Sequence, residues 1–387
     1  MTEAVIVATA RTPIGRAFKG SLTEVRPDDM SGFIIDKLMD KVPEVPRDAI
    51  EDVIWGAAGQ AGEQSMNLGR NAAALAGLPD TVPGTTVNRF CASSLQTIRM
   101  AFHAIKAGEG DVFVSGGSES VSRAGGGFGR EHMNPRFVDK SRPDYVNDMY
   151  IPMGFTAENV AEKFGISRER MDEFGALSQN RAVAAQDNGF FEREITPITT
   201  PDGTVVSADD GPRRGVTAES MAQLKPVFKE DGRVTAGNAC PLNDGAAAVL
   251  VMSDTKAAEY GLTPLARIVA SSVSGLAPEI MGVGPIEACR KVLDRAGMSI
   301  GDIDVVELNE AFAAQVLPVC DEVGISIEDQ LNPHGGAIAL GHPFGMTGAR
   351  IMTTLINDLQ TLDRTYGLET MCIGGGQGMA MIIERLS

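Results

Sequence analysis

Three side chains in this sequence have the types and surroundings of a nucleophile, a base and a proton shuttle. Cys91 stands at a predicted strand-to-helix junction, Cys372 lies beside the glycine run 374–376, and His342 lies in the glycine-rich run 335–348. Glycine-rich backbone lets a ligand come close, and histidine exchanges protons near neutral pH. A thiol at a helix N-terminus faces the positive end of the helix dipole, which favours the thiolate. Together these features predict nucleophilic catalysis by a thiol.

Each cysteine also has a plainer structural interpretation. Cys91 and Cys372 could be small buried core residues, although backbone N–H groups in the glycines after Cys372 could also bind a developing oxyanion. Cys289 and Cys320 fall inside amphipathic helices and are expected in the core. Cys240 could line a pocket, but packing is favoured. Five cysteines without tight spacing indicate neither a disulfide framework nor a zinc site.

The other histidines and one glutamate leave their roles open. His103 is expected mid-helix as a surface or packing residue, and His132 lies in a polar loop. His334 could be aimed into a site by the loop that carries His342, or simply be exposed. Glu310 stands at a predicted helix start, where a carboxylate could be a cap or a site residue.

These residues belong to a chain in which short apolar strands alternate with helices. In the first part, strands are expected at 4–8, 53–55, 85–87 and 111–115, and helices at 30–42, 67–76 and 92–106. From residue 263 the plan repeats, with strands at 265–273, 305–308 and 370–373 and helices at 286–296, 311–323 and 347–359. Such alternation indicates an α/β protein with a mainly parallel sheet covered by helices.

The repeat suggests that one βα unit has been duplicated. Residues 245–252 resemble the closing apolar strand 378–383, but they lie about 130 residues after the preceding strand of the first copy. An insertion at 121–243 explains that displacement. We therefore expect one half built from 1–120 and 244–262, and a second half at 263–387. The inserted, loop-rich segment is the predicted lid or ligand-binding part.

Composition restricts the function classes. The 387-residue chain has a net charge of −17 and 43% hydrophobic residues, which describes a soluble globular protein of two or three domains. Nonspecific nucleic-acid binding is not expected because it requires a basic surface. An anionic substrate would need a local basic patch. No phosphate-binding P-loop, dinucleotide-binding glycine fingerprint or metal-ligand spacing is present.

The sequence also bears on location. No apolar run approaches the roughly 20 residues of a membrane span, and no signal peptide is visible at the N-terminus. The chain is therefore expected to be cytoplasmic, with reduced thiols.

Ordered blocks along the chain carry a resemblance to a known family. These blocks are 11–15, 88–96, 116–120, 153–159, 235–238 with 243–246, 309–312, 335–348 and 372–376. Together they resemble the thiolase family over essentially the whole chain. The resemblance implies an α/β fold of two duplicated βα halves, layered α-β-α-β-α, with an inserted loop domain.

The resemblance also implies a role for each catalytic residue. Cys91 would be the acylated nucleophile, and His342 would take its proton. Cys372 would protonate the departing acetyl-CoA enolate and then deprotonate the incoming CoA thiol. Asn309 would hold a water that joins His342 in one oxyanion hole, and backbone N–H groups of Cys91 and Gly374 would form the other. These groups suit cleavage of a carbon–carbon bond by a reverse Claisen reaction.

By the same resemblance, CoA is a substrate and no other cofactor or metal is expected. It would lie against the inserted domain, near Arg213, Met153, Cys240, Ala311 and Phe312. Arg213 and its neighbour Arg214 form a basic pair that would suit the anionic nucleotide end of CoA. Family members are dimers or tetramers, so a homodimer or homotetramer is expected.

Departures from the family pattern bear on the substrate. Many members carry Gly at Ser94 and Ser at Cys240, and acetoacetyl-specific members tend to have His at Pro152. Phe344 and Met346 are bulky residues beside the catalytic histidine and could reshape the acyl pocket. We expect a degradative 3-ketoacyl-CoA thiolase of fatty acid β-oxidation. The alternatives are an acetoacetyl-CoA thiolase that runs the condensation and an inactive CoA- or lipid-binding module of the same fold.

Overall fold

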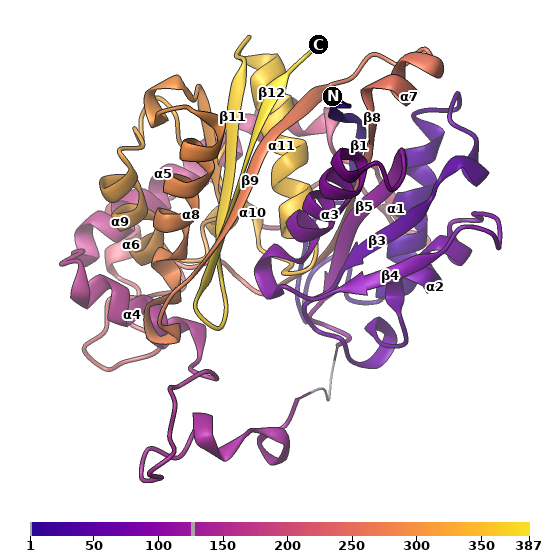
Figure 1. The fold of residues 1–387 in the computed structure, drawn as a ribbon. Helices are drawn as coiled ribbons and strands as arrows, with labels where there is room; N and C mark the ends of the chain where they lie inside the picture. The colour runs from indigo at the N-terminus through magenta and orange to yellow at the C-terminus, as the bar shows by residue number, and fades with distance from the viewer. Residues whose placement is uncertain (1, 125–127) are drawn as a thin grey trace.

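The computed structural model describes residues 2–124 and 128–387, and the glycine-rich run 125–129 therefore lies partly outside the described residues. Ten strands form one sheet (Figure 1). Their order is β10 (Val305–Leu308), β11 (Tyr366–Ile373), β12 (Gln377–Arg385), β9 (Ala266–Gly275), β1 (Ala4–Arg11), β8 (Asn243–Ser253), β5 (Val112–Ser120), β3 (Asp52–Gly56) and β4 (Gly84–Val87), with β2 (Gly15–Arg16) beside β8.

The prediction of a mainly parallel sheet was wrong. In the described residues only the pairs β3–β4, β3–β5 and β10–β11 are parallel. The remaining pairs in this sheet, which are β1–β8, β1–β9, β2–β8, β5–β8, β9–β12 and β11–β12, are antiparallel. The long strands β8 and β12 each return beside the parallel set of their own half, and the two halves meet at β1 and β9. Alternation of strands and helices in a sequence does not reveal these returns.

The helices lie in three layers around the two wings of the sheet (Figure 1). Helices α3 (Ser93–Ala107) and α11 (Thr347–Thr361) are packed between the wings, and their apolar side chains share one core with both. Helices α1 (Pro27–Asp40) and α2 (Leu68–Leu75) cover the outside of the first wing. Helices α8 (Gly284–Ala296) and α9 (Ala313–Val323) cover the second. This is the α-β-α-β-α layering that the sequence predicted.

The described residues between β5 and β8 form three helices and a short hairpin, joined by long irregular segments. These elements are α4 (Met153–Lys163), α5 (Arg168–Asp187), α6 (Ala218–Ala222) and the hairpin of β6 (Ile198–Thr199) and β7 (Val205–Val206). Residues 128 to about 150 project away from the body (Figure 1). A buried ion network ties the rest to β1, because Arg11 contacts Glu194 at 2.8 Å and Asp209 at 2.9 Å.

Short elements complete the chain. They are α7 (Asp254–Glu259), α10 (Ala337–Leu340) and the 3-10 turns Arg47–Ala49, Gly62–Gln64, Phe90–Ala92, Arg130–His132, Pro135–Phe137, Phe190–Arg193, Pro278–Val283 and Ile300–Asp302. Within the described ranges, no helix has both the length and the apolar character needed to cross a membrane.

Candidate active site

Cys91 lies in the 3-10 turn that joins β4 to α3. The turn begins with Phe90 in the left-handed region, at φ 46°, so the backbone reverses sharply just before the thiol. Cys91 is buried, and the backbone N–H of Gly374 donates a hydrogen bond to its sulfur. The sequence-predicted nucleophile and glycine run are therefore in direct contact, although they are far apart in the chain.

The expectation of a thiolate at Cys91 was wrong for the site as it stands. Burial raises the pKa of this thiol to about 11, despite hydrogen bonds from Gly374 and from its own N–H. The helix begins only at Ser93, and burial outweighs any stabilisation by the helix dipole. Cys91 is therefore a protonated thiol at neutral pH, and attack by its sulfur requires a base.

His342 is held rigidly by its loop. Gly341 adopts φ 111°, and a Cβ there would lie 2.6 Å from the side chain of Asn243. The Asn243 side-chain oxygen accepts the backbone N–H of His342 at 3.0 Å. The glycine is required at this position because both its φ and the close approach of Asn243 exclude a side chain.

The hydrogen bonds of His342 define its tautomer. Its Nδ1 lies 2.6 Å from Oγ1 of Thr347, and the Thr347 hydroxyl donates to the carbonyl of Pro343 at 2.8 Å. Because the hydroxyl has one proton, it accepts from His342, so Nδ1 carries the ring proton. The lone pair on Nε2 faces the amide of Asn309, with Nδ2 at 3.3 Å. Thr347 was missed by the sequence reasoning, although its position five residues after the histidine was a usable signal.

Burial also sets the charge of this imidazole. It lowers the pKa of His342 to about 3, and the positive charge of Arg350 acts in the same direction. The ring is therefore neutral at physiological pH, with its basic nitrogen available. The thiol of Cys91 and the imidazole of His342 are thus each neutral at rest.

Asn309 follows β10 and has a free oxygen. Its backbone N–H donates to the carbonyl of Thr370 on β11 at 3.0 Å, and its side-chain Oδ1 is buried with no hydrogen-bond partner among the described residues. That oxygen can accept from a water, as the expected oxyanion hole requires. The neighbouring Glu310 is buried and accepts from Ser178, Asn332 and the N–H of Ile338, so it anchors the loop that leads to His342.

Cys372 and Cys240 complete a group of thiols around Cys91. Cys372 is fully buried on β11, and burial, followed by the proximity of Cys91 and Cys240, raises its pKa well above the ordinary value. Burial and the proximity of Cys91 raise the pKa of Cys240 to about 12. All five cysteines are free thiols, and Cys289 and Cys320 are buried in the core as expected.

The residues expected near CoA fall into two groups. Met153 begins α4, and a Cβ on Gly374 would lie 3.8 Å from its sulfur. The backbone N–H of Cys240 donates to Ala311 at 3.0 Å, and Ala239 pairs with Phe312 in an isolated bridge. These residues therefore lie on segments that contact the catalytic ones.

Arg213 lies between β7 and α6, and Gln179 connects it to the loop of His342. Its backbone N–H donates to Gln179, whose side chain also donates to the carbonyl of Ile338 at 3.3 Å. Its guanidinium is exposed and has no ion pair in the described residues, whereas Arg214 pairs with Asp187. Arg213 is thus the member of the basic pair that is available to an anion.

His334 does not join the site. Its ring stacks on Phe190 with centroids 3.6 Å apart, and its Nδ1 lies 2.5 Å from Asp358. His103 is exposed on α3, as expected for a surface residue. The described residues contain no group of three or more side chains placed to hold a metal ion.

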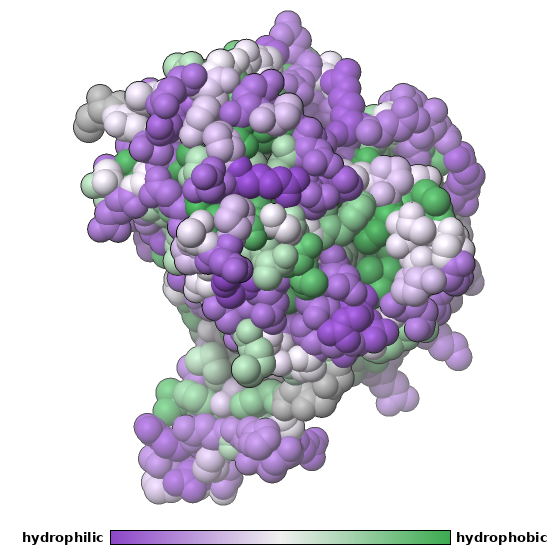
Figure 2. Space-filling model, turned by 90° about the vertical axis from the view of Figure 1, so that its right-hand side faces the viewer, coloured by the Kyte–Doolittle hydropathy of each residue, from purple (hydrophilic) through white to green (hydrophobic). Residues whose placement is uncertain are grey.

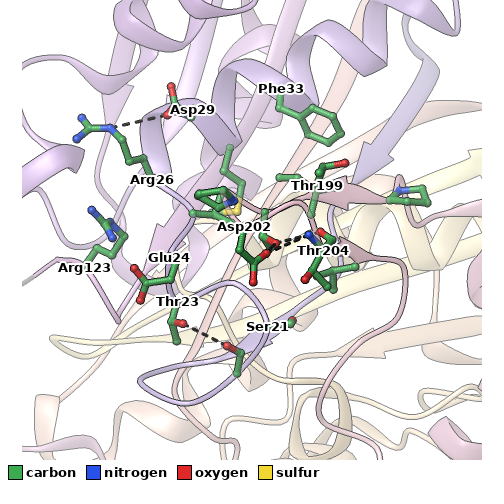
Figure 3. A pocket seen from close by; sticks show the side chains of 18 residues that line it. Ser21, Thr23, Glu24, Arg26, Asp29, Phe33, Arg123, Thr199, Asp202 and Thr204 are labelled. Carbon is green, nitrogen blue, oxygen red and sulfur yellow. Dashed lines mark hydrogen bonds and ion pairs between the residues drawn. The ribbon is translucent and has the colours of Figure 1, made fainter.

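A separate cavity of about 920 Å³ lies between α1, the loop at 20–26 and the β6–β7 hairpin. Figure 3 shows Arg26 and Arg123 on one side of it and Phe33 and Thr199 on another. None of the sequence-predicted site residues lines this cavity.

Comparison with known proteins identifies the family. The thiolase N-terminal domain matches residues 4–255, and the thiolase C-terminal domain matches residues 262–385. The chain belongs to the thiolase family. The fold class and the enzyme class predicted from the sequence, a thiolase-type acyltransferase, are confirmed.

Relatives of the chain match over its full length. A β-ketoadipyl-CoA thiolase of Acinetobacter baylyi is 48% identical, and a 3-ketoacyl-CoA thiolase of Idiomarina loihiensis is 46% identical, each with 100% of both chains covered. The crystal structure of the Bacillus anthracis acetyl-CoA acetyltransferase superposes with a TM-score of 0.91 at 40% identity, covering 100% of this chain and 99% of that one.

Proposed function

We propose that this thiolase cleaves 3-ketoacyl-CoA with CoA, giving acetyl-CoA and a shortened acyl-CoA through an acyl-enzyme on Cys91. The observation that carries the proposal is the contact between the Gly374 N–H and the Cys91 sulfur, with the Cys372 thiol beside them. A thiol that already faces a backbone donor, next to a second thiol, has the groups needed for acyl transfer and for a proton transfer in one place.

In the first half-reaction, the Cys91 sulfur attacks the 3-keto carbon while Nε2 of His342 takes the thiol proton. Nε2 carries a lone pair because the other ring nitrogen, Nδ1, holds the ring proton and donates it to Thr347. The carbon–carbon bond then breaks, its electron pair forms the acetyl-CoA enolate, and Cys372 supplies a proton to that carbon. The high pKa of Cys372 suits this step, because the group must be protonated when the enolate forms.

In the second half-reaction, the Cys372 thiolate takes the proton of the incoming CoA thiol. The CoA sulfur attacks the acyl carbon, the bond to Cys91 breaks, and the Cys91 sulfur recovers its proton from His342. N–H groups of Cys91 and Gly374 would stabilise one oxyanion. His342 and a water on the unpartnered Oδ1 of Asn309 would stabilise the other. Protons balance over the cycle, and the acyl-thiolysis needs no metal or redox group.

The proposed substrate is a 3-ketoacyl-CoA longer than acetoacetyl-CoA. Pro152, at the N-cap of α4, stands where acetoacetyl-specific members tend to have His. Phe344 packs edge-on against His342, with ring centroids 5.0 Å apart, and so borders the acyl side of the site. Relatives named for β-ketoadipyl-CoA and for 3-ketoacyl-CoA make both dicarboxylic and fatty acyl chains part of the substrate panel.

CoA would lie against the 121–243 segment, with Met153, Cys240, Ala311 and Phe312 near the pantetheine arm. Arg213 would contact the anionic nucleotide end, because its guanidinium is exposed and has no carboxylate partner in the described ranges. The location that we propose is the cytoplasm.

We also propose a homo-oligomer whose subunits meet at the edge of β4. Figure 2 shows apolar side chains gathered on the face that carries α2 and β4. Met66, Leu75 and Phe90 expose 86%, 52% and 48% of their surface there. An exposed strand edge beside apolar side chains is a surface that a second strand can extend.

The test is a panel of 3-ketoacyl-CoA esters of graded length, branching and terminal charge, with mass measurement of acylated Cys91. Wild-type protein should gain the mass of the shortened acyl group. Cys91→Ala should fold but form no acyl-enzyme, and full turnover by this variant would remove Cys91 as the nucleophile. Exclusive use of acetoacetyl-CoA would favour the four-carbon alternative.

A further inference from the structure

A half-buried arginine connects the segment before Cys91 to the glycine turn after Cys372. Arg89 donates through Nε to Oε1 of Gln96 on α3 at 2.9 Å, and through Nη1 to Oε1 of Gln377 on β12 at 2.9 Å. Its own backbone N–H donates to Ser93 at 3.0 Å. The planar guanidinium therefore fixes two elements of different halves at a defined separation.

Gln377 carries this connection to the oxyanion donor. Its Nε2 donates to the carbonyl of Gly374 at 3.3 Å, while its Oε1 accepts from Arg89. Gln377 pairs with Ile373 in the β11–β12 ladder, so residues 374–376 form the turn between them. The side chain of Gln377 thus connects Arg89, two residues before Cys91, to Gly374, whose N–H faces the Cys91 sulfur.

The glycine turn has little else to fix its orientation. Gly375 and Gly376 lie in the left-handed region at φ 76° and 80°, and Gly374 has no side chain. Three consecutive glycines have many accessible backbone conformations, so an N–H in such a turn needs an external restraint to point one way. The Gln377 bond to the Gly374 carbonyl supplies a restraint on the peptide that follows this N–H.

The acceptors of Arg89 indicate a positional role. Both are neutral amides, and no carboxylate forms an ion pair with Arg89 in the part of the chain that the structure describes. A stability-driven surface arginine would gain more from a carboxylate. The two hydrogen bonds of Arg89 to glutamine side chains instead fix the orientation of the groups that they join while contributing little binding energy.

We propose that Arg89 and Gln377 are positioning residues that keep the Gly374 N–H aimed at the sulfur and the acyl oxygen on Cys91. This inference rests on the proposed function, because it assigns the pair to acyl transfer. Cys372 is held independently, since it pairs with Gly378 in the β11–β12 ladder. The pair therefore acts on acylation of Cys91 and not on proton transfer by Cys372.

The experiment compares two reactions of the same protein. Gln377→Met keeps the side-chain length and Arg89→Met keeps an unbranched apolar chain as far as the position of Nε, and both remove the hydrogen bonds. Acylation of Cys91 by a 3-ketoacyl-CoA, followed by rapid quenching and mass measurement, should slow about 10- to 100-fold in kcat with KM little changed. Exchange of the α-proton of acetyl-CoA, which uses Cys372, should stay within about twofold of wild type.

Two further variants make the result specific. Arg99→Met, one α3 turn beyond Gln96, removes a half-buried arginine whose Nε bonds Ser271 at 3.2 Å and not the glycine turn. It should acylate at the wild-type rate. The double variant Arg89→Met/Gln377→Met should be no slower than the slower single variant, because both changes break one connection.

The outcomes separate the two proposals. If wild-type protein is never acylated, the proposed function fails. If wild-type protein is acylated and both single variants match its rate, the positioning role fails. Equal losses of acylation, α-proton exchange and melting temperature would also overturn it, because they would indicate a general structural defect.

Discussion

The hydroxyl of Ser94 accepts a hydrogen bond from the backbone N–H of Ala349 at 2.9 Å. Ser94 lies three residues after the nucleophile on α3, and Ala349 lies in the first turn of α11, which follows His342. The serine thus satisfies one of the free N–H groups at the start of the other helix. The helix that follows Cys91 and the helix that follows His342 are thus joined where they begin.

Gly348 makes this approach possible, and Gly348→Ala should separate the two helices. A Cβ at Gly348 would lie 2.3 Å from the backbone nitrogen of Leu95, so the backbone must shift. We expect a loss of about 1–3 kcal/mol in the free energy of unfolding, measured in denaturant, together with slower acylation of Cys91. Gly301→Ala is the control, since nothing lies closer than 3.7 Å to its Cβ. Equal stability of the two variants would contradict the packing argument.

Thr347→Val should slow acylation without unfolding the protein. Valine has the same shape but cannot accept the hydrogen bond from Nδ1 of His342. The ring is then no longer held in the tautomer that leaves Nε2 basic. Loss of such an orienting partner typically costs about 10- to 100-fold, and rapid-quench acylation measures it. Thr353→Val is the matched control. The hydroxyl of Thr353 donates to the carbonyl of Ala349 in the same helix at 2.8 Å and does not touch His342. Both variants retaining the wild-type rate would refute the orienting role.

Cys372→Ser should separate the two half-reactions. The hydroxyl fits the same buried position but is a much weaker acid than a thiol. The variant should therefore still acylate Cys91 slowly and should not exchange the α-proton of acetyl-CoA in deuterated buffer. Exchange at the wild-type rate would remove Cys372 as the acid/base.

The buried neutral imidazole of His342 should make the free energy of unfolding decrease as the pH falls. The pKa of His342 is about 3 in the folded protein and about 6.5 when unfolded, so between these values the unfolded chain binds the extra proton. The His342 contribution is fully present above pH 6.5 and falls with pH by up to about 1.4 kcal/mol per unit. Unfolding at pH 7 and pH 5 should therefore show a larger loss in wild type than in His342→Asn.

His334 serves as the internal reference for that comparison. Burial lowers its pKa to about 4, so it destabilises the protein in acid in both wild type and the variant. Only the difference between the two proteins reports His342. An identical loss in both would show that this ring does not titrate on unfolding.

Several features followed from local sequence. The ends of most predicted helices agree with the structure within three residues, as for α11, predicted at 347–359 and observed at Thr347–Thr361. The glycine-rich blocks around His342 and Cys372 could be recognised because close backbone approach leaves a local mark, the absence of side chains. The five-layered fold followed from the family resemblance, and the expectation of two similar halves followed from the repeated order of elements.

Other features depend on residues that no local pattern connects. The antiparallel returns of β8 and β12 were missed because strand direction is set by pairing across the sheet. His334 and His342 share one glycine-rich loop, yet one ring stacks on Phe190 and the other faces Asn309.

By itself, the sequence indicated the groups that we propose to carry the chemistry and the order of the elements that present them. The tertiary structure decided the protonation state and the orientation of these groups. Cys91 is a neutral thiol because burial removes it from water, and burial likewise keeps His342 neutral, while Thr347 leaves the lone pair on Nε2. Desolvation and hydrogen-bond direction depend on the full three-dimensional surroundings of a group, and those surroundings come from segments hundreds of residues apart.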